Sequence, residues 1–291
     1  MEKRWVLERS LDETVANRLA QELNISPVLG RLLLKRGVDS FEGARHFFRP
    51  KLEQLHDPFL MKDMDKAIDR MEQAISDKEK ILIYGDYDVD GTTAVSTVYL
   101  FFKRYYSELD FYIPDRYKEG YGISRQGIEW AAENGFSLIV ALDCGIKAKE
   151  QVAYAKSLGI DFIICDHHLP PPELPEAAAV LDPKRPDCPY PFKELSACGI
   201  GYKLIQAFLK KNDLPPEHAY QFLDLVAVSI ASDIVPITDE NRILAHFGLL
   251  KLAADPGPGL KALLKTAGIT KNTLSISDIV FGIGPRINAA G

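Results

Sequence analysis

The sequence predicts an α/β fold, in which a parallel sheet carries helices on both faces. Three observations support this fold class. Short apolar runs recur from residue 80 onward, helical patterns separate them, and an acidic residue directly follows three of the runs. Strands that alternate with helices form parallel sheets, because each strand returns to the same edge through a crossover helix.

Five short apolar runs are the expected strands of this sheet, since each has a length typical of a buried strand. They cover 81–84, 110–113, 138–142, 162–165 and 178–181. Helical patterns lie between them at 91–105, 124–134 and 147–158. Proline-rich stretches at 170–172 and 183–191 mark loops.

We expect three parts along the chain. A helical N-terminal region covers 1–75, the α/β core covers 76–235, and a helical extension covers 236–291. Helical spacing runs from Leu11 to Leu23, and Ser40 is a suitable cap for a helix over 41–48 that ends before Pro50. A further helix is expected at 63–76.

The composition is that of an ordinary globular protein, with 291 residues, 46% of them hydrophobic and 26% charged. We expect no membrane segment and no signal peptide, and therefore a cytoplasmic protein. The four cysteines lack C-x-x-C spacing, which favours buried thiols over disulfides or zinc. The formal charge of −6 argues against non-specific nucleic-acid binding, but it suits an acidic site that metal ions neutralise.

Acidic residues follow three of the expected strands at the point where each strand ends. A further acid, Asp233, ends a helix-like apolar stretch at 225–232. Because the carboxyl ends of parallel strands share one edge of the sheet, these side chains are expected to converge on one crevice. The strand-end residues are Asp86, Asp88 and Asp90 after the first run, Asp143 after the third, and Asp166, His167 and His168 after the fourth.

These strand-end motifs contain no lysine or arginine to offset their acids. Such a cluster repels itself and raises its own pKa values, and divalent metal ions remove that repulsion. Mixed carboxylate and imidazole ligands suit Mn²⁺ or Mg²⁺ at one position and a slightly softer ion at the other. Two ions about 4 Å apart form an arrangement that activates water and binds a phosphoryl group.

The neighbours His167 and His168 would point to opposite faces of a regular strand. Both can serve one site only at a turn beyond the strand end. Taken alone, this pair therefore leaves open whether it binds metal.

The acidic motifs also have plainer explanations, which the residues alone leave open. The segment 86–91 resembles the start of an EF-hand loop, but Val98 stands where that loop needs its glutamate. Gly91 also simply permits a tight turn from strand to helix. An acid followed by a glycine, as at 143–145, is common in α/β loops, and Asp233 is suited to cap the next segment.

Taken together, the order of these motifs resembles the DHH phosphoesterase superfamily and, within it, the RecJ family of single-stranded-DNA-specific exonucleases. The resemblance covers almost the whole chain. It rests on the segments 85–94 (Gly-Asp-Tyr-Asp-Val-Asp-Gly-Thr-Thr-Ala), 115–122 (Asp-Arg-Tyr-Lys-Glu-Gly-Tyr-Gly), 166–168 (Asp-His-His), 181–184 (Leu-Asp-Pro-Lys), 232–233 (Ser-Asp) and 284–291 (Gly-Pro-Arg-Ile-Asn-Ala-Ala-Gly).

The resemblance implies a role for each matching residue. Asp143 would bridge two metal ions, and His168 would face the scissile phosphate. Asp90 would orient its loop, and Asp166 would orient an imidazole as a partner outside the ligand set. The implied metal ligands are Asp86, Asp88, Asp143, His167 and Asp233.

Three further residues are implied to bind substrate phosphate, namely Arg116, Arg286 and Asn288. The fork of an arginine suits phosphate. The alternative for Arg116 is a surface ion pair with Asp115 or Glu119.

The activity implied by the resemblance is 5′-to-3′ degradation of single-stranded DNA to 5′-mononucleotides, in DNA repair and recombination. The implied cofactors are two divalent ions, with Mn²⁺ preferred or Mg²⁺. The implied partners are single-stranded DNA, a single-strand-binding protein and a helicase. Members of this family continue into a DHH-associated domain, so we expect an N-terminal fragment that is weakly active or inactive alone.

Two other functions stay open. One is a different DHH phosphoesterase, such as an oligonucleotide or phosphoadenosine phosphatase, a cyclic-dinucleotide phosphodiesterase or a manganese pyrophosphatase. The helical N-terminus and the segment 115–120 favour the exonuclease over these. The other is a non-catalytic binding module, like the degenerate DHH relative of eukaryotic replisomes, which would be expected to have lost ligands.

Overall fold

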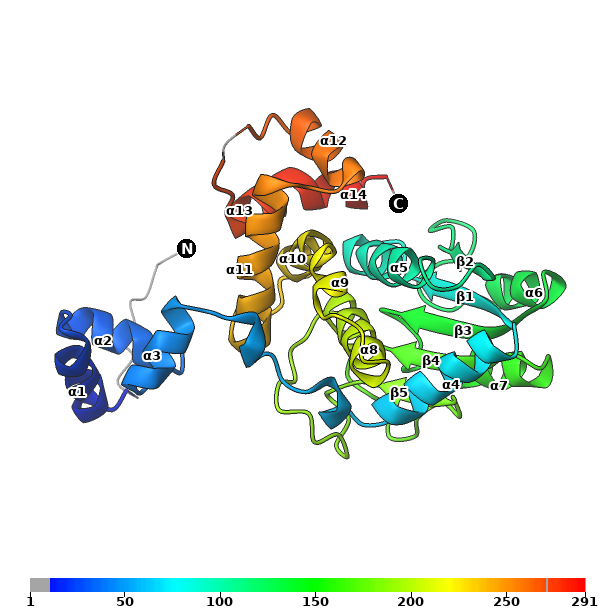
Figure 1. Cartoon of the computed structure of the whole chain (residues 1–291), viewed down its shortest axis with the longest axis horizontal. Coiled ribbons are helices and arrows are strands. Elements are labelled where there is room, and N and C mark those ends of the chain that lie inside the picture. The colour runs from blue at the N-terminus through cyan, green and yellow to red at the C-terminus, as the bar shows by residue number, and fades with distance from the viewer. Residues whose placement is uncertain (1–10, 271, 291) are drawn as a thin grey trace, which may run out of the picture. The chain divides into compact units, whose positions relative to one another are not determined.

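The computed structural model describes residues 11–270 and 272–290. Residues 1–10 of the expected helical N-terminal region, and Gly291 of the last motif, lie outside the described residues. Internal contacts divide the chain into two compact units, Met1–Leu55 and His56–Gly291 (Figure 1). Among the described residues, no helix is both long and apolar enough to cross a bilayer.

The first unit is a group of short helices around a small apolar core. The Asp12 side chain accepts hydrogen bonds from the backbone N–H groups of Thr14 and Val15 and so starts the first helix. Leu19 and Leu33 are among the buried residues of the core. The elements are α1 (Glu13–Leu23), α2 (Pro27–Leu34), α3 (Phe41–Phe48) and the 3₁₀ turn η1 (Leu52–Gln54).

The second unit contains a five-stranded sheet in the order β2-β1-β3-β4-β5, with every neighbouring pair parallel. All five expected strands are present within two residues of their expected bounds, which confirms the fold class. The strands are β1 (Lys80–Gly85), β2 (Leu109–Tyr112), β3 (Phe136–Leu142), β4 (Asp161–Cys165) and β5 (Ala179–Leu181).

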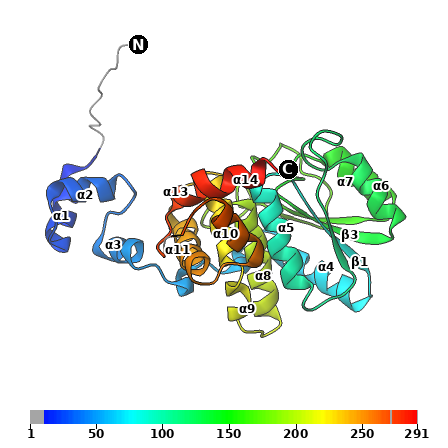
Figure 2. The same ribbon diagram turned by 90° about the horizontal axis from the view of Figure 1, so that it is seen from above.

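Helices cover both faces of the sheet (Figure 2). Helices α4, α5 and α8 lie on one face, and α6 and α7 lie on the other. Leu82 and Ile139 are among the buried residues that pack toward α6 and α7, in agreement with the alternation of side chains along a strand. The helices are α4 (Met64–Ser76), α5 (Val89–Phe102), α6 (Arg125–Glu133), α7 (Lys149–Ser157) and α8 (Ala197–Lys211).

Helix α4 belongs to the sheet-containing unit, although we expected it within a helical region over 1–75. It packs against β5 and α8. Its side chains Met64, Ile68 and Met71 are fully buried there. The expected boundary at 75/76 therefore differs from the observed division at 55/56, because the apolar face of α4 completes the core of the sheet.

Helices also form the C-terminal part of the second unit. Ala227 and Val228 of α10 pack with Leu252 of α11 and Ile279 and Ile283 of the π-helical turn η3. This packing places the end of α10, and with it Asp233, beside the C-terminal segment. The elements are η2 (Pro58–Leu60) ahead of α4, then α9 (Glu217–Tyr220), α10 (Leu223–Ser232), α11 (Asp239–Ala254), α12 (Pro258–Thr266), α13 (Ile276–Asp278), η3 (Ile279–Ile283) and α14 (Gly284–Asn288).

Candidate metal centre

The strands β1, β3 and β4 end at the same level of the sheet. Gly85 pairs with Leu142, and Leu142 pairs with Cys165. The three acidic motifs therefore begin from neighbouring points on one edge. This register explains why residues about 80 positions apart in the chain meet in one site.

Asp143 lies at the centre of this edge. Its backbone N–H still donates to the Cys165 carbonyl at 3.0 Å, but its φ of +62° is left-handed, an unusual conformation for a side-chain-bearing residue. The side chain is almost fully buried, and its Oδ1 atom has no hydrogen-bond partner within residues 11–270 and 272–290. Burial raises the pKa of Asp143 well above its usual range, and the charges of Asp90 and Asp88 raise it further.

A first ligand cluster joins Asp86, Asp88 and Asp143, whose carboxylate oxygens lie within 4.8 Å of one another. Asp88 caps α5 by accepting a hydrogen bond from the Gly91 N–H at 3.0 Å. A Cβ atom on Gly91 would lie 2.4 Å from the Asp86 carbonyl, so the tight turn requires glycine. Burial raises the pKa of Asp86 to about 6, and its Oδ2 atom is buried without a partner.

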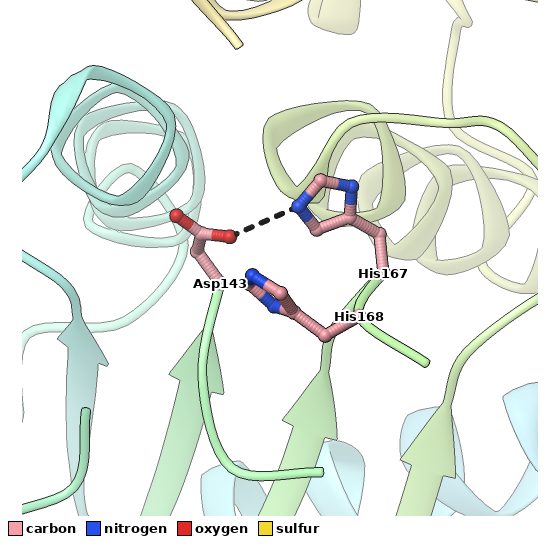
Figure 3. A group of neighbouring side chains, drawn as sticks. All are labelled: Asp143, His167 and His168. Carbon is pink, nitrogen blue, oxygen red and sulfur yellow. Dashed lines mark ion pairs between the residues drawn. The ribbon is translucent and has the colours of Figure 1, made fainter. Parts of the chain in front are cut away.

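A second ligand cluster joins Asp90, His167 and Asp233. The His167 Nε2 atom lies 3.3 Å from Asp143 Oδ1, 3.7 Å from Asp233 Oδ2 and 3.8 Å from Asp90 Oδ2. Figure 3 shows the His167 ring directed at Asp143. Burial raises the pKa of Asp233, and the charge of Asp90 adds to that rise. The clusters thus meet at Asp143.

Asp90, expected to orient its loop, also belongs to this second cluster. Its carboxylate accepts hydrogen bonds from the backbone N–H groups of Ala197 at 2.8 Å and Cys198 at 2.9 Å. The Ser229 hydroxyl donates to it at 2.7 Å. Asp90 therefore ties the start of α5 to the N-terminus of α8 and to α10, the helix that leads to Asp233.

Asp166 orients the imidazole of His168. Its Oδ1 atom accepts from His168 Nδ1 at 2.7 Å, and its Oδ2 atom accepts from the Ile146 N–H at 3.0 Å. The hydrogen bond to Asp166 raises the pKa of His168. Burial opposes the ionisation of Asp166, but the contacts with His168 outweigh it and lower the pKa of that carboxyl. His168 is partly exposed, and Asp143 and His167 lie close to it (Figure 3).

The Arg116 guanidinium lies over the ring of Tyr87, 4.5 Å from the ring centroid. Its Nε atom is buried and makes no hydrogen bond to any described residue, and its charge is one of the smaller influences that lower the pKa of Asp86. The alternative ion pairs do not form among the described residues, since Asp115 pairs with Lys118, and Glu119 accepts from the Tyr112 and Ser124 hydroxyls. The geometry leaves this cation available beside the first cluster.

Asn288 and Arg286 lie in α14. The Asn288 Oδ1 atom accepts a hydrogen bond from the Val89 N–H at 3.1 Å, so this side chain holds the loop between Asp88 and Asp90. Arg286 is exposed and donates to the Gly282 carbonyl at 2.5 Å. The structure gives Asn288 a contact with the metal-site loop that the motif alone did not indicate.

Sequence reasoning assigned no role to Tyr121 or Ser229. The Tyr121 hydroxyl donates to the Asp143 carbonyl at 3.1 Å and lies 3.3 Å from His168 Nε2. Tyr121 lies within the family motif at 115–122, so that motif could have indicated a role for this residue. Ser229 lies in an apolar helix, and nothing in its local pattern distinguishes it.

The donor set of this centre fits divalent cations. Oxygens of Asp86 and Asp143 are buried without hydrogen-bond partners in the described part of the chain, which is costly unless a cation satisfies them. Carboxylates with one imidazole are ligands that suit Mn²⁺ and Mg²⁺. Asp143 is the residue placed to contribute to both clusters.

Fold and site together define an α/β domain with a candidate divalent-metal centre at the carboxyl edge of its sheet, and the comparisons with known proteins give its family. Residues 80–230 match the DHH family, N-terminal domain. The chain belongs to the DHH family.

Among curated proteins the chain is similar to the single-stranded-DNA-specific exonuclease RecJ of Bacillus subtilis (strain 168). The two are 45% identical over 288 residues, which is 99% of this chain and 36% of the relative. The RecJ proteins of Salmonella typhimurium and Escherichia coli are each 34% identical, and the chain covers 51% and 50% of them. The chain therefore spans between about a third and a half of these relatives.

Among solved structures, too, the chain is similar to RecJ exonucleases. A manganese-bound exonuclease RecJ superposes with a TM-score of 0.73 at 29% identity, over 82% of this chain and 59% of that chain. RecJ from Thermus thermophilus in complex with Mn²⁺ gives a TM-score of 0.79 at 25% identity, over 96% of this chain and 39% of that chain.

Proposed function

We propose that this chain carries the catalytic metal centre of a 5′-to-3′ exonuclease, which hydrolyses single-stranded DNA to 5′-mononucleotides in DNA repair and recombination. The observation that carries the proposal is the pair of ligand clusters that meet at Asp143. The similarity to RecJ proteins narrows the substrate from phosphodiesters in general to single-stranded DNA.

Asp86, Asp88 and Asp143 would hold one divalent ion, and Asp143, His167 and Asp233 would hold the other, with Asp90 adjoining the second. Mn²⁺ is the preferred ion, and Mg²⁺ is the alternative. Two such ions make bound water more acidic and neutralise the charge of a phosphoryl group.

The chain's own groups position the substrate around these ligands. Asp166 accepts the Nδ1 hydrogen bond of His168 and fixes the ring, so that Nε2 can donate to a phosphate oxygen or to the leaving oxygen. Arg116, stacked on Tyr87, is placed to bind a phosphate oxygen beside Asp86. Asn288 holds the backbone between Asp88 and Asp90.

A single-strand-binding protein and a helicase are proposed as further partners, in the cytoplasm. Their support is the family resemblance, since cleavage of single strands requires that a duplex be opened and its strand be presented. Pull-down of either partner by the protein would test this part.

The direct test gives the full-length protein that contains this chain single-stranded DNA with a 5′ label, together with Mn²⁺. The protein is expected to release labelled mononucleotide from the start of the reaction. Asp143→Asn should slow this release at least about 1000-fold, because Asp143 belongs to the first cluster and lies 3.3 Å from His167 of the second. Asp110→Asn changes an exposed carboxylate of β2 and should leave the rate unchanged. Equal rates for Asp143→Asn and the unaltered protein would contradict the proposal.

A further inference from the structure

A cavity of about 240 Å³ opens beside His168, between the loop that follows β2 and the loop that follows β3. Its floor is mostly apolar and includes Ile123, Ile146 and Ala148. Gly122 also lines it with a φ of +86° and open space where a Cβ atom would stand. The cavity therefore has a largely apolar lining next to the residue expected to face the scissile bond.

Two polar side chains at the rim have no partner of their own. Lys147 and Gln151 line the cavity, and neither makes a hydrogen bond or ion pair within the described ranges 11–270 and 272–290. Lys147 lies close enough to His168 for its charge to oppose the rise in the pKa of that imidazole. A primary amide offers both donors and an acceptor, and an ammonium offers donors only. These groups remain available for a ligand.

Tyr121 forms an aromatic wall of the cavity. Its side chain is 56% exposed, while its hydroxyl is held by the Asp143 carbonyl at 3.1 Å. The adjoining loop is fixed as well, because the buried Tyr84 hydroxyl donates to the Gly122 carbonyl at 3.0 Å and accepts from the Ser124 N–H at 3.0 Å. A ring that is fixed at one end and open on its face suits stacking against a flat ligand.

We propose that this cavity binds the base of the nucleotide immediately 5′ of the scissile phosphate. The assignment rests on the proposed function, in which His168 stands at the leaving oxygen, and that oxygen belongs to this nucleotide's sugar. The volume admits one nucleoside rather than two. The amide of Gln151 offers both donors and an acceptor, so it can pair with the edge of any base.

A second hollow of about 350 Å³ shares Tyr121, Ile123 and Gln151 with this cavity but is excluded from the assignment. Its cations are already paired, Lys118 with Asp115 and Arg125 with Glu129. The positive charges of its walls are therefore already balanced by neighbouring carboxylates.

The test compares two single-stranded substrates with Mn²⁺. They differ only in whether the nucleotide 5′ of the scissile phosphate carries its base or is a tetrahydrofuran abasic unit. For the unaltered protein, loss of the base should lower kcat/KM about tenfold or more. Ala148→Phe, which fills the cavity, should lower kcat/KM for the normal substrate to the abasic level and leave the abasic substrate unchanged.

Gln151→Leu nearly preserves the side-chain volume and removes the amide. It should lower kcat/KM for the normal substrate, by less than Ala148→Phe does, and leave the abasic substrate unchanged. Lys149→Leu, at an exposed position of the same helix that pairs with Glu173, is the matched control and should change neither rate. Equal loss on both substrates in folded Ala148→Phe and Gln151→Leu, or no loss in either variant, would overturn the assignment.

If the unaltered full-length protein cleaves neither substrate, the proposed exonuclease activity is contradicted. A binding measurement then tests separately whether the cavity takes up a base. Calorimetry would then compare thymidine 5′-monophosphate with deoxyribose 5-phosphate on the metal-free protein. Tighter binding of the thymidine compound, lost in Gln151→Leu, supports the assignment. Equal binding of both compounds overturns it.

Discussion

Two buried groups of ionisable side chains in the same compact unit differ in how they are balanced. At the carboxyl edge of the sheet, aspartates gather around one histidine, and oxygens of Asp86 and Asp143 have no hydrogen-bond partner among the residues that the structure describes. Under the start of α11, Lys203 and Glu240 form an ion pair with both side chains fully buried. In the first group some buried carboxylate oxygens lack a partner within the described chain, whereas in the second group each charged side chain has a partner of opposite charge.

The Lys203 and Glu240 pair satisfies its own charges. Lys203 Nζ donates to Glu240 at 2.5 Å and to the His56 carbonyl at 2.9 Å. Glu240 also accepts from the Tyr190 hydroxyl at 2.5 Å and from the His56 N–H at 2.9 Å. Burial lowers the pKa of Lys203, and the charge of Glu240 opposes that change. This pair therefore joins α8 and α11 and needs no outside ion.

The difference indicates what each group does. A buried charge that is paired and hydrogen-bonded supports the folded state once both partners are present. A buried acid cluster without cations destabilises the folded state until a cation arrives. Opposite effects on stability are therefore expected when the two groups are altered.

The largest expected effect on stability comes from Glu240→Gln. It leaves the buried Lys203 ammonium without its counter-charge, so we expect the free energy of unfolding to fall by about 3 to 5 kcal/mol. Urea unfolding followed by circular dichroism measures this change. Asp239→Asn, on the more exposed carboxylate of the neighbouring residue, is the control and should change stability little. Equal stability of Glu240→Gln and the unaltered protein would contradict the claim that the Lys203 and Glu240 pair stabilises the folded state.

A smaller effect is expected at Asp63, another paired carboxylate. Burial opposes its ionisation, but hydrogen bonds from Lys66 and Arg185 outweigh it and lower its pKa. The stability from a lowered carboxyl pKa is present above pH about 4 and is lost as the pH falls through the folded-state pKa. Asp63→Asn should therefore cost about 2 kcal/mol at pH 7 and less at pH 3.

The measurement for Asp63 is urea unfolding at both pH values, with Asp65→Asn as the control at an exposed position of the same helix. A loss that does not shrink at pH 3 would show that the side chain acts through something other than its charge.

The smallest effect has the opposite sign. In metal-free protein, Asp143→Asn removes one of several buried like charges while nearly preserving shape. We expect the free energy of unfolding to rise by about 1 kcal/mol, as is common when a functional residue is replaced. Thermal unfolding in the presence of EDTA measures this rise. A fall in stability would show that Asp143 is primarily structural.

Much of the fold followed from local pattern. The apolar runs and the helices between them lie where periodicity predicts, because burial on both faces of a parallel sheet needs continuous apolar strands. The convergence of Asp86, Asp88, Asp143 and His167 followed from the rule that parallel strands share one carboxyl edge. The structure brings these residues together with Asp233.

Other features depend on contacts that no local pattern records. Asn288 reaches Val89 across 199 positions, and Ser229 reaches Asp90 across 139. Such hydrogen bonds depend on how helices pack rather than on the period of a segment. The grouping of α4 with the sheet was missed for the same reason, because an apolar helix face does not specify which neighbour it covers.

The central claim is that the strand-end cluster is completed by two divalent ions that meet at Asp143. The most direct measurement is a calorimetric titration of Mn²⁺ into protein stripped with EDTA, for the unaltered protein, Asp143→Asn and folded Glu240→Gln. We predict two ions bound per chain for the unaltered protein and for Glu240→Gln, and a loss of binding at both positions in Asp143→Asn. Unchanged Mn²⁺ binding in Asp143→Asn, or no binding by the unaltered protein, would contradict the claim.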